Sequence, residues 1–374
     1  MTAILAALLC GALVYTLLSI LAAIQYLGVR PCEHGAQEPI SVLKPLFGLE
    51  RGLESNLRTF FEQDYSAFEI LFAVRDSADP AIAVVEDLQR EYPRVPARLL
   101  ITGEPPYSNA KVYSLDCMLA AAAHDLVVMS DSDTRATPSM LRALSAEFLD
   151  PQVGLATCPY RAVPGPGLWS RVEAAGMNTD FLAGILVARM IEGMHFAIGP
   201  TIAARRSVLK SIGGFNRLKD YLAEDFVMGK FAAEAGHGVI LSSYVIEHHI
   251  GGTDLRHTAA HRLRWVRSTR RSRPLGYVGQ IFTMPVPIAI LCCALSPAWW
   301  PVLPAVMVLR TLAAWVLATR VARARFSLPL LAVEDLASFC FWVAGFFGNT
   351  ITWRGRRYRL YSDGRFAPIP GLAE

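Results

Sequence analysis

The chain has 374 residues, enough for one large domain or two, and a formal net charge of +4. Hydrophobic residues make up 53% and charged residues only 18%, whereas soluble domains average about 25% charged, so a wholly soluble protein is excluded. The seven cysteines show no Cys-x-x-Cys or Cys/His zinc spacing, so we expect reduced thiols and no disulfide framework.

The first predicted element is an apolar helix at residues 3–29. It carries no charged residue and is long enough to span a bilayer core. It lacks a basic n-region, and its apolar stretch is longer than that of a typical signal peptide. We therefore predict an uncleaved transmembrane anchor over residues 1–29.

Residues 38–255 resemble an ordinary soluble domain. Short apolar runs ending in Pro, Gly or Asp predict strands, and amphipathic spacing between them predicts helices. The strands are expected at 40–48, 68–76, 97–103 and 125–131, and the helices at 49–63, from Asp79 onward, and at 111–124. This alternation favours a mostly parallel sheet, in which ligands bind beyond the carboxyl ends of the strands. No Gly-x-Gly-x-x-Gly follows the first strand and no P-loop is present, which disfavours a dinucleotide or P-loop site.

Two of these strands end in carboxylates. Asp131 and Asp133 follow "VVMS", and at positions i and i+2 both can reach one hard cation and leave room for phosphate oxygens. The alternative is an Asx-turn, or a cap for the helix near Pro138. Asp76 ends another strand, where it could hold a ligand hydroxyl or base, or simply close a turn.

Other residues of this domain could also contact a ligand. Lys111 follows a proline-rich loop and could meet phosphate, or it could be a solvated lysine at a helix start. Glu224 and Asp225 open a predicted helix at 221–238, where they could be stabilised by the helix dipole or act as a general base. His248 and His249 end a strand-like run, where one of them could complete a metal site or both could be packed or surface histidines.

A basic stretch, residues 256–273, holds seven arginines and no acid, and it contains "HRLRW". Arg264 could bind a leaving diphosphate, and Trp265 could stack on a ring or close a pocket. The alternative is an interfacial basic helix anchored by its tryptophan. Residues 177–196 are apolar and could line a lipid entrance or form a buried core helix.

The C-terminal part, residues 274–353, is predicted to be a membrane region. A charge-free run at 275–309 and apolar sequence up to 319 are enough for two spans hinged near "SPAWWP". The last apolar segment, 336–353, follows Glu334 and Asp335, which are costly in a span unless paired, so it could instead lie in or re-enter the interface. Arginine clusters flank these segments and mark the cytoplasmic side. The soluble domain and a basic tail at 354–374 are then expected in the cytoplasm, if the N-terminus is outside, the proline-rich region spans twice and the last segment does not fully cross.

The order of these residues resembles the family 2 glycosyltransferases and, more closely, family 21, the ceramide glucosyltransferases. Seven blocks recur in the same order in such enzymes: "ISVLKPLFG", "FFEQDY", "VRDSADPAIAVV", "NAKV", "GGF", "YLAEDF" and "RW". "SRPLGY" and the histidine of "HRLRW" look most similar to bacterial hopanoid-biosynthesis glycosyltransferases. The resemblance covers about residues 38–280.

The resemblance implies an α/β fold: an A-type nucleotide-sugar-binding domain, mostly parallel sheet flanked by helices, with N-terminal and C-terminal transmembrane helices. It implies an inverting enzyme that depends on Mn²⁺ or Mg²⁺. The enzyme would move glucose or N-acetylglucosamine from a UDP-sugar donor to a hydroxyl of a membrane lipid acceptor, either ceramide or a hopanoid. It also implies an integral protein of the lipid bilayer, in a bacterial inner membrane, with no nucleic-acid partner.

The roles transfer position by position. Asp76 would contact uracil or ribose, Asp131 and Asp133 would hold the metal, with Asp133 the more direct ligand, and Asp225 would be the catalytic base. Lys111 and Glu224 would belong to the nucleotide-sugar site, and Arg264 and Trp265 match the end of the family's [Q/R]xxRW element.

One position departs from the family pattern. His261 stands where the element has Gln or Arg. In processive polysaccharide synthases that Gln is thought to engage the acceptor sugar, so its absence weakens a polymer-making interpretation. The alternatives that we keep are such a processive synthase and a catalytically inactive, membrane-anchored binding protein of the same fold.

Overall fold

The computed structural model describes residues 2–29, 38–251, 254–353 and 356–373. They fall into two compact units. The sheet unit comprises Arg30–Tyr160 and Glu192–Gly251, and the helical unit comprises Met1–Val29, Arg161–Ile191 and Gly252–Glu374. Each unit is described by itself.

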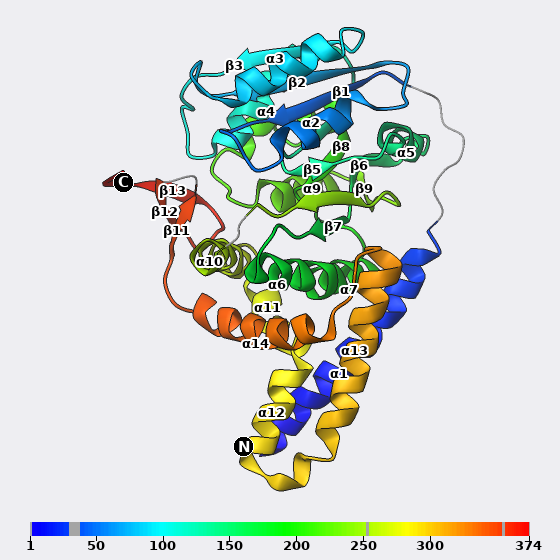
Figure 1. Ribbon diagram of the computed structural model, residues 1–374, viewed down its shortest axis with the longest axis vertical. Coiled ribbons are helices and arrows are strands. Elements are labelled where there is room, and N and C mark those ends of the chain that lie inside the picture. Colours follow the sequence, from blue (N-terminus) through cyan, green and yellow to red (C-terminus); the bar gives the residue numbers. More distant parts are fainter. Residues whose placement is uncertain (1, 30–37, 252–253, 354–355, 374) are drawn as a thin grey trace. The chain divides into compact units, whose positions relative to one another are not determined.

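A seven-stranded sheet forms the centre of the sheet unit, with strand order β3-β2-β1-β4-β8-β6-β9 (Figure 1). Its strands are β1 (Ile40–Pro45), β2 (Phe68–Val74), β3 (Ala97–Ile101), β4 (Leu126–Ser130), β6 (Val153–Thr157), β8 (Thr201–Arg205) and β9 (Gly238–Leu241). Strand β1 pairs in parallel with β2 and β4, β2 with β3, and β6 with β9, whereas β8 is antiparallel to β4 and β6. This arrangement confirms the expected mostly parallel sheet.

The central strands are apolar because both of their faces are covered. All six residues of β1 and all five of β4 are buried, as expected for parallel strands with helices on each side. The helices of this unit are α2 (Leu53–Phe61), α3 (Ala81–Glu91), α4 (Ala110–Ala121), α5 (Met140–Glu147), α8 (Arg206–Ser211), the 3₁₀ turn η2 (Phe215–Arg217) and α9 (Glu224–Glu234). The core includes Leu43, Leu71, Val127 and Ile202 from four neighbouring strands.

Two local features fix the segments around the edge of the sheet. The side chain of Asn109 accepts a hydrogen bond from the backbone N–H of Val112 and so caps the N-terminus of α4. A short strand, β5 (Thr134–Arg135), pairs in antiparallel fashion with β10 (Ile246–His249) and sets His248 opposite Thr134.

The helical unit contains long apolar helices, a basic helix and several short helical turns. They are α1 (Thr2–Leu27), α6 (Leu168–Gly176), which continues through the π-helix η1 (Met177–Phe181) into α7 (Leu182–Glu192), α10 (Leu255–Ser272), α11 (Pro274–Gly279), the 3₁₀ turn η3 (Gln280–Thr283), α12 (Pro285–Leu295), the 3₁₀ turn η4 (Pro297–Trp299), α13 (Val302–Val316), the π-helix η5 (Leu317–Val321) and α14 (Leu328–Gly345). The chain passes from the sheet unit to this unit within β7 (Tyr160–Val163).

Among the described residues, four helices are long and apolar enough to cross a membrane, or up to five if a bent pair is one span. They are Ala3–Leu27, Leu168–Glu192, Val302–Val321 and Leu328–Gly345, and the bent pair is Pro274–Thr283 with Pro285–Leu295. Turn η4 separates α12 from α13 where the sequence predicts a hinge. The apolar residues 177–196 lie largely within the second of these helices.

The last apolar segment has other bounds than the expected 336–353. Its helix, α14, begins at Leu328 and ends at Gly345, and residues 350–353 form a strand. The helix starts earlier because Glu334 and Asp335 are paired with arginines inside the unit (below), so they do not interrupt it. The strands β11 (Thr350–Trp353), β12 (Arg356–Leu360) and β13 (Phe366–Ala373) form an antiparallel sheet, in part of the region expected to be a basic tail.

Candidate active site

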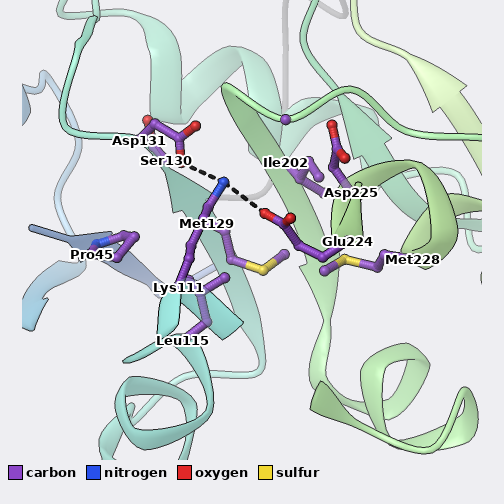
Figure 2. Close-up of a pocket in the computed structure, with 11 residues that line it drawn as sticks. Pro45, Lys111, Leu115, Met129, Ser130, Asp131, Ile202, Glu224, Asp225 and Met228 are labelled. Carbon is purple, nitrogen blue, oxygen red and sulfur yellow. Dashed lines mark ion pairs between the residues drawn. The ribbon is translucent and has the colours of Figure 1, made fainter. Parts of the chain in front are cut away.

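A pocket lies beyond the carboxyl ends of β1 and β4 (Figure 2). Pro45 and Ser130 come from these strand ends, and Glu224 and Asp225 come from the first turn of α9. The pocket is lined by Pro45, Lys111, Leu115, Met129, Ser130, Asp131, Gly199, Ile202, Glu224, Asp225 and Met228. Four residues predicted from the sequence, Lys111, Asp131, Glu224 and Asp225, therefore meet at the edge of the sheet where ligands are expected.

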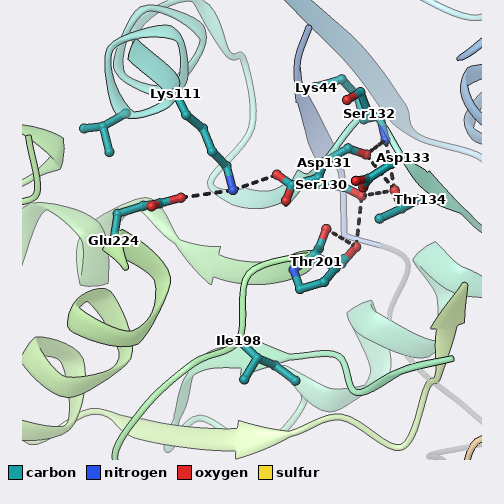
Figure 3. Close-up of polar contacts among 12 residues, drawn as sticks. Lys44, Lys111, Ser130, Asp131, Ser132, Asp133, Thr134, Ile198, Thr201 and Glu224 are labelled. Carbon is teal, nitrogen blue, oxygen red and sulfur yellow. Dashed lines mark hydrogen bonds and ion pairs between the residues drawn. The ribbon is translucent and has the colours of Figure 1, made fainter. Parts of the chain in front are cut away.

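Lys111 bridges two carboxylates across this pocket. Its Nζ lies 2.7 Å from Asp131 Oδ1 and 3.0 Å from Glu224 Oε1 (Figures 2 and 3). Burial by itself would lower the pKa of Lys111, but the negative charges of Asp131 and Glu224 outweigh burial and raise it. Lys111 is thus a permanent cation beside three acids, suited to contact phosphate.

The first turn of α9 presents Glu224 and Asp225 to the pocket. The side-chain amide of Asn109 donates to the backbone oxygen of Tyr221 at 2.8 Å and lies 3.4 Å from Glu224 Oε2, which fixes this turn. Gly199 leaves room for Asp225, because a Cβ at that position would lie 2.9 Å from Asp225 Oδ2.

Asp225 has the proton affinity of a general base. Burial and the adjacent charge of Glu224 raise the pKa of Asp225 to about 7, and Lys111 partly offsets them. A carboxylate whose pKa lies near neutrality can take a proton from a hydroxyl in the transition state and release it afterwards.

Asp131 and Asp133 lie in different electrostatic surroundings. Burial and the charge of Asp133 outweigh Lys111 and raise the pKa of Asp131. Burial would also raise the pKa of Asp133, but His248, Lys44 and Lys111 lower it to about 2. The pairing of β5 with β10 places His248 Nδ1 3.3 Å from Asp133 Oδ1. Asp133 is therefore fully ionised at neutral pH.

These two carboxylates fit a hard divalent cation. Their side chains are 31% and 34% exposed, so a ligand can reach them. Within the described part of the chain, no group of three or more His, Cys, Asp or Glu side chains is placed to hold a metal by itself. Mg²⁺ and Mn²⁺ commonly take one or two carboxylates and complete their coordination with phosphate oxygens and water. The donor set therefore suits a cation that binds together with a diphosphate.

Lys44, which was not predicted as a site residue from the sequence, supports the Asp131–Asp133 turn. Its side chain is fully buried at the end of β1, with Nζ 2.5 Å from the backbone oxygen of Asp131 and 3.1 Å from Thr134 Oγ1 (Figure 3). The ammonium also lies 3.6 Å from the ring centroid of Phe60. Burial lowers the pKa of Lys44 to about 7, against the opposing effect of the nearby acids. The available signal was a lone lysine within the apolar run "ISVLKP".

Asp76 lies outside the pocket lining. It follows β2, is exposed, and accepts a hydrogen bond from the backbone N–H of Ala78 at 2.9 Å, as in an Asx-turn. Its proposed contact with the nucleoside stays a prediction.

Arg264 and Trp265 belong to α10 of the helical unit, so their contact with the diphosphate also stays a prediction. Within that unit, the Trp265 ring centroid lies 5.6 Å from that of Phe181 and 5.0 Å from that of His261. His261 Nδ1 in turn bonds to the buried carboxylate of Glu173. The basic helix expected around "HRLRW" is therefore present, and its tryptophan is packed on one side.

The fold is that of an A-type glycosyltransferase. A mannosyltransferase from Pyrobaculum calidifontis, PcManGT, solved in complex with GDP-Man and Mn²⁺, superposes with a TM-score of 0.57 over 92% of this chain and 97% of that one, at 18% identity. The sequence profile of glycosyl transferase family 21 matches residues 3–366, and the chain belongs to this family.

The relatives include ceramide glucosyltransferases. Ceramide glucosyltransferase 1 of Caenorhabditis elegans is 28% identical over 207 residues, which are 55% of this chain and 44% of the relative. Ceramide glucosyltransferase of Komagataella phaffii is 36% identical over 100 residues, 26% of this chain and 20% of the relative. The matches to the two Caenorhabditis elegans relatives span about half of their length, 44% and 50%.

Proposed function

We propose that this chain is an inverting glycosyltransferase that moves one sugar from a UDP-sugar to a hydroxyl of a membrane lipid. The observation that carries this proposal is the pocket in which Asp225, with a pKa of about 7, lies beside Lys111, Asp131 and Glu224 in a family 21 chain. The apolar helices of the same chain support a lipid as the acceptor, because they would place the enzyme at a bilayer.

The donor would bind by its diphosphate at the mouth of the pocket. Lys111 supplies a fixed positive charge, and Asp131 and Asp133 would hold Mn²⁺ or Mg²⁺, with Asp133 the more direct ligand because it is fully ionised. When bound, such an ion neutralises charge that develops on the leaving diphosphate. Arg264 would add a second positive charge there, Trp265 would close the site, and Asp76 would contact the nucleoside.

The acceptor hydroxyl would be activated by Asp225. The hydroxyl oxygen attacks the anomeric carbon from the face opposite the diphosphate, the bond from that carbon to the phosphate oxygen breaks, and the hydroxyl proton passes to Asp225. A single in-line displacement inverts the anomeric centre and needs no covalent nucleophile. The raised pKa of Asp225 suits this proton transfer at neutral pH.

The relatives suggest the acceptor and the sugar. Relatives named ceramide glucosyltransferases support ceramide or another sphingoid lipid as acceptor and glucose as the sugar. A hopanoid is the competing acceptor, based on the sequence resemblance around His261, and N-acetylglucosamine is the competing sugar. We further propose that the sheet unit works on the cytoplasmic side of a bacterial inner membrane.

The test uses the purified full-length protein in phosphatidylcholine vesicles with Mn²⁺. UDP-glucose and UDP-N-acetylglucosamine are each offered with ceramide and with a hopanoid, UDP release is followed, and the lipid product is identified by mass spectrometry. We expect a product with one added sugar, of inverted anomeric configuration by NMR, and loss of product in EDTA. A product with many sugars would favour a processive synthase, and UDP binding without any product would favour an inactive binding protein.

A further inference from the structure

The helical unit contains a charged cluster that the proposed transfer reaction does not use. Arg310 of α13 lies between two carboxylates, with Nη2 2.7 Å from Asp180 Oδ1 of η1 and 2.6 Å from Asp335 Oδ1 of α14. Arg310 and Asp335 are each only 5% exposed, whereas Asp180 is 21% exposed. Ionisable groups within apolar helices are costly, so each of them raises the question of a functional site.

A second ion pair adjoins this cluster. Arg262 of α10 bonds to Glu334, which is fully buried and also accepts from Ser338 Oγ at 2.6 Å. Gly176 permits this approach, because a Cβ there would lie 2.1 Å from Glu334 Oε1. Together the cluster and this pair hold three carboxylates and two guanidinium groups, so their formal charges sum to about −1.

The hydroxyl of Tyr15 points to a missing ligand. Its oxygen is buried and has no hydrogen-bond partner among the described residues, although it lies within electrostatic reach of Asp180 and Arg310. Buried hydroxyls almost always find a partner. Helix α1, which carries Tyr15, contacts α13 in the helical unit, and α6 contacts α14 (Figure 1). An unpartnered hydroxyl within electrostatic reach of a partly exposed carboxylate leaves a donor and an acceptor for a ligand.

We propose that Tyr15 and Asp180 bind the uncharged headgroup of a membrane lipid that carries hydroxyl or amide groups. A lipid hydroxyl can accept a hydrogen bond from Tyr15 and donate one to Asp180, which neither a carboxylate nor an ammonium group can do at once. The excess negative charge disfavours a phosphate headgroup, and an ammonium headgroup cannot accept the hydrogen bond that the Tyr15 hydroxyl can donate. The identification of this lipid with the sugar acceptor rests on the proposed function, but its binding requires no sugar transfer.

The experiment measures lipid binding without donor or metal. Full-length protein is placed in phosphatidylcholine nanodiscs, N-acylsphingosine is added as the probe, and its Kd and the change in Tm are measured. We expect saturable binding, a raised Tm, at least tenfold weaker binding in Asp180→Asn, and roughly fivefold weaker binding in Tyr15→Phe. Tyr361→Phe, which changes an exposed tyrosine of the same unit, is the matched control and should bind as the wild type does.

Tyr15→Phe separates a ligand-binding hydroxyl from a structural one. Since the hydroxyl has no partner within the described chain, removing it should leave the Tm of the lipid-free protein unchanged or slightly raised. A lower lipid-free Tm would show that the hydroxyl is already bonded, for example to water, and would overturn the proposal. Wild-type affinity in both variants, or tighter binding of phosphatidic acid than of N-acylsphingosine, would also overturn it.

A failure of this lipid site can be distinguished from a failure of the proposed transfer reaction. Binding that depends on Tyr15 and Asp180, without any glycolipid product, would leave this site intact and remove only the transfer reaction. Glycolipid formation with an unchanged acceptor KM in Tyr15→Phe and Asp180→Asn would retain the transfer reaction and remove only this site.

Discussion

The two units use similar charges for different purposes. In the pocket of the sheet unit, Lys111 bridges Asp131, which reaches solvent, and Glu224, which is nearly buried. In the helical unit, Arg310 bridges Asp180 and Asp335 and is almost completely buried. A lysine is a compact charge on a flexible stem that can exchange partners, whereas an arginine has a planar fork that holds carboxylates in a fixed geometry. The first arrangement suits the exchange of partners that the proposed binding of a cation and a diphosphate requires, and the second joins helices.

The largest expected effect is on the reaction. Asp225→Asn removes the proposed base but keeps the shape of the pocket, so turnover should fall about 10²–10⁴-fold. UDP binding, measured by calorimetry with Mn²⁺, should stay within about threefold of the wild-type value, because Lys111 and the two acids that we propose to hold the metal remain. Glu86→Gln, on the exposed face of α3, is the control and should not change turnover. Normal turnover in Asp225→Asn would show that another group is the base.

Next in size is the effect on the stability of the helical unit. Arg310→Met leaves the buried Asp335 and the partly exposed Asp180 without their counter-charge, which should cost about 3–5 kcal/mol of stability. Thermal unfolding in detergent measures this loss. Arg256→Met, at an exposed position of α10, should cost less than about 0.5 kcal/mol. Equal losses in the two variants would contradict a structural role for the buried arginine.

A smaller effect is expected at Lys44. Lys44→Met keeps the volume but removes the ammonium that holds the backbone oxygen of Asp131 and the hydroxyl of Thr134. A hydrogen bond from a charged group contributes about 1.5–3 kcal/mol, so the affinity for UDP and Mn²⁺ should fall roughly 10–100-fold. Calorimetry with Lys230→Met as the control tests this, since Lys230 makes only a surface pair with Glu234. An unchanged affinity for UDP and Mn²⁺ in Lys44→Met would show that Lys44 does not support this turn.

The smallest effect is a pH dependence. The base must be deprotonated, and the pKa of Asp225 is raised to about 7, so kcat/KM should fall about tenfold per pH unit below 7 and level off above it. A profile from pH 5.5 to 8.5 measures this limb. The residual activity of Asp225→Asn should not fall in this way below pH 7. If kcat/KM of the variant shows the same fall, another group is responsible for the titration.

Parts of both units could be predicted from the sequence because they depend on local pattern. The apolar runs that end in Asp131 and Asp133 and the helix start at Glu224 gave the sheet edge and most of the pocket residues. Lys44 was missed because a single charge in a strand does not reveal its partners, which lie 87 and 90 residues away.

The same limit applies to the helical unit. The ends of α14 were misplaced because its acids are neutralised by Arg262 and Arg310, 72 and 25 residues distant. Side-chain pairing over such separations follows from packing and cannot be seen in periodicity.

The central claim is that Asp225 is the base for sugar transfer to a lipid hydroxyl. Single-turnover formation of glycolipid from UDP-glucose and ceramide, followed by mass spectrometry in the wild type and in Asp225→Asn, tests it most directly. The account predicts one sugar per lipid in the wild type and at least a hundredfold slower formation in the variant at equal donor occupancy. Equal rates in the two proteins, or UDP release without a glycolipid, would contradict it.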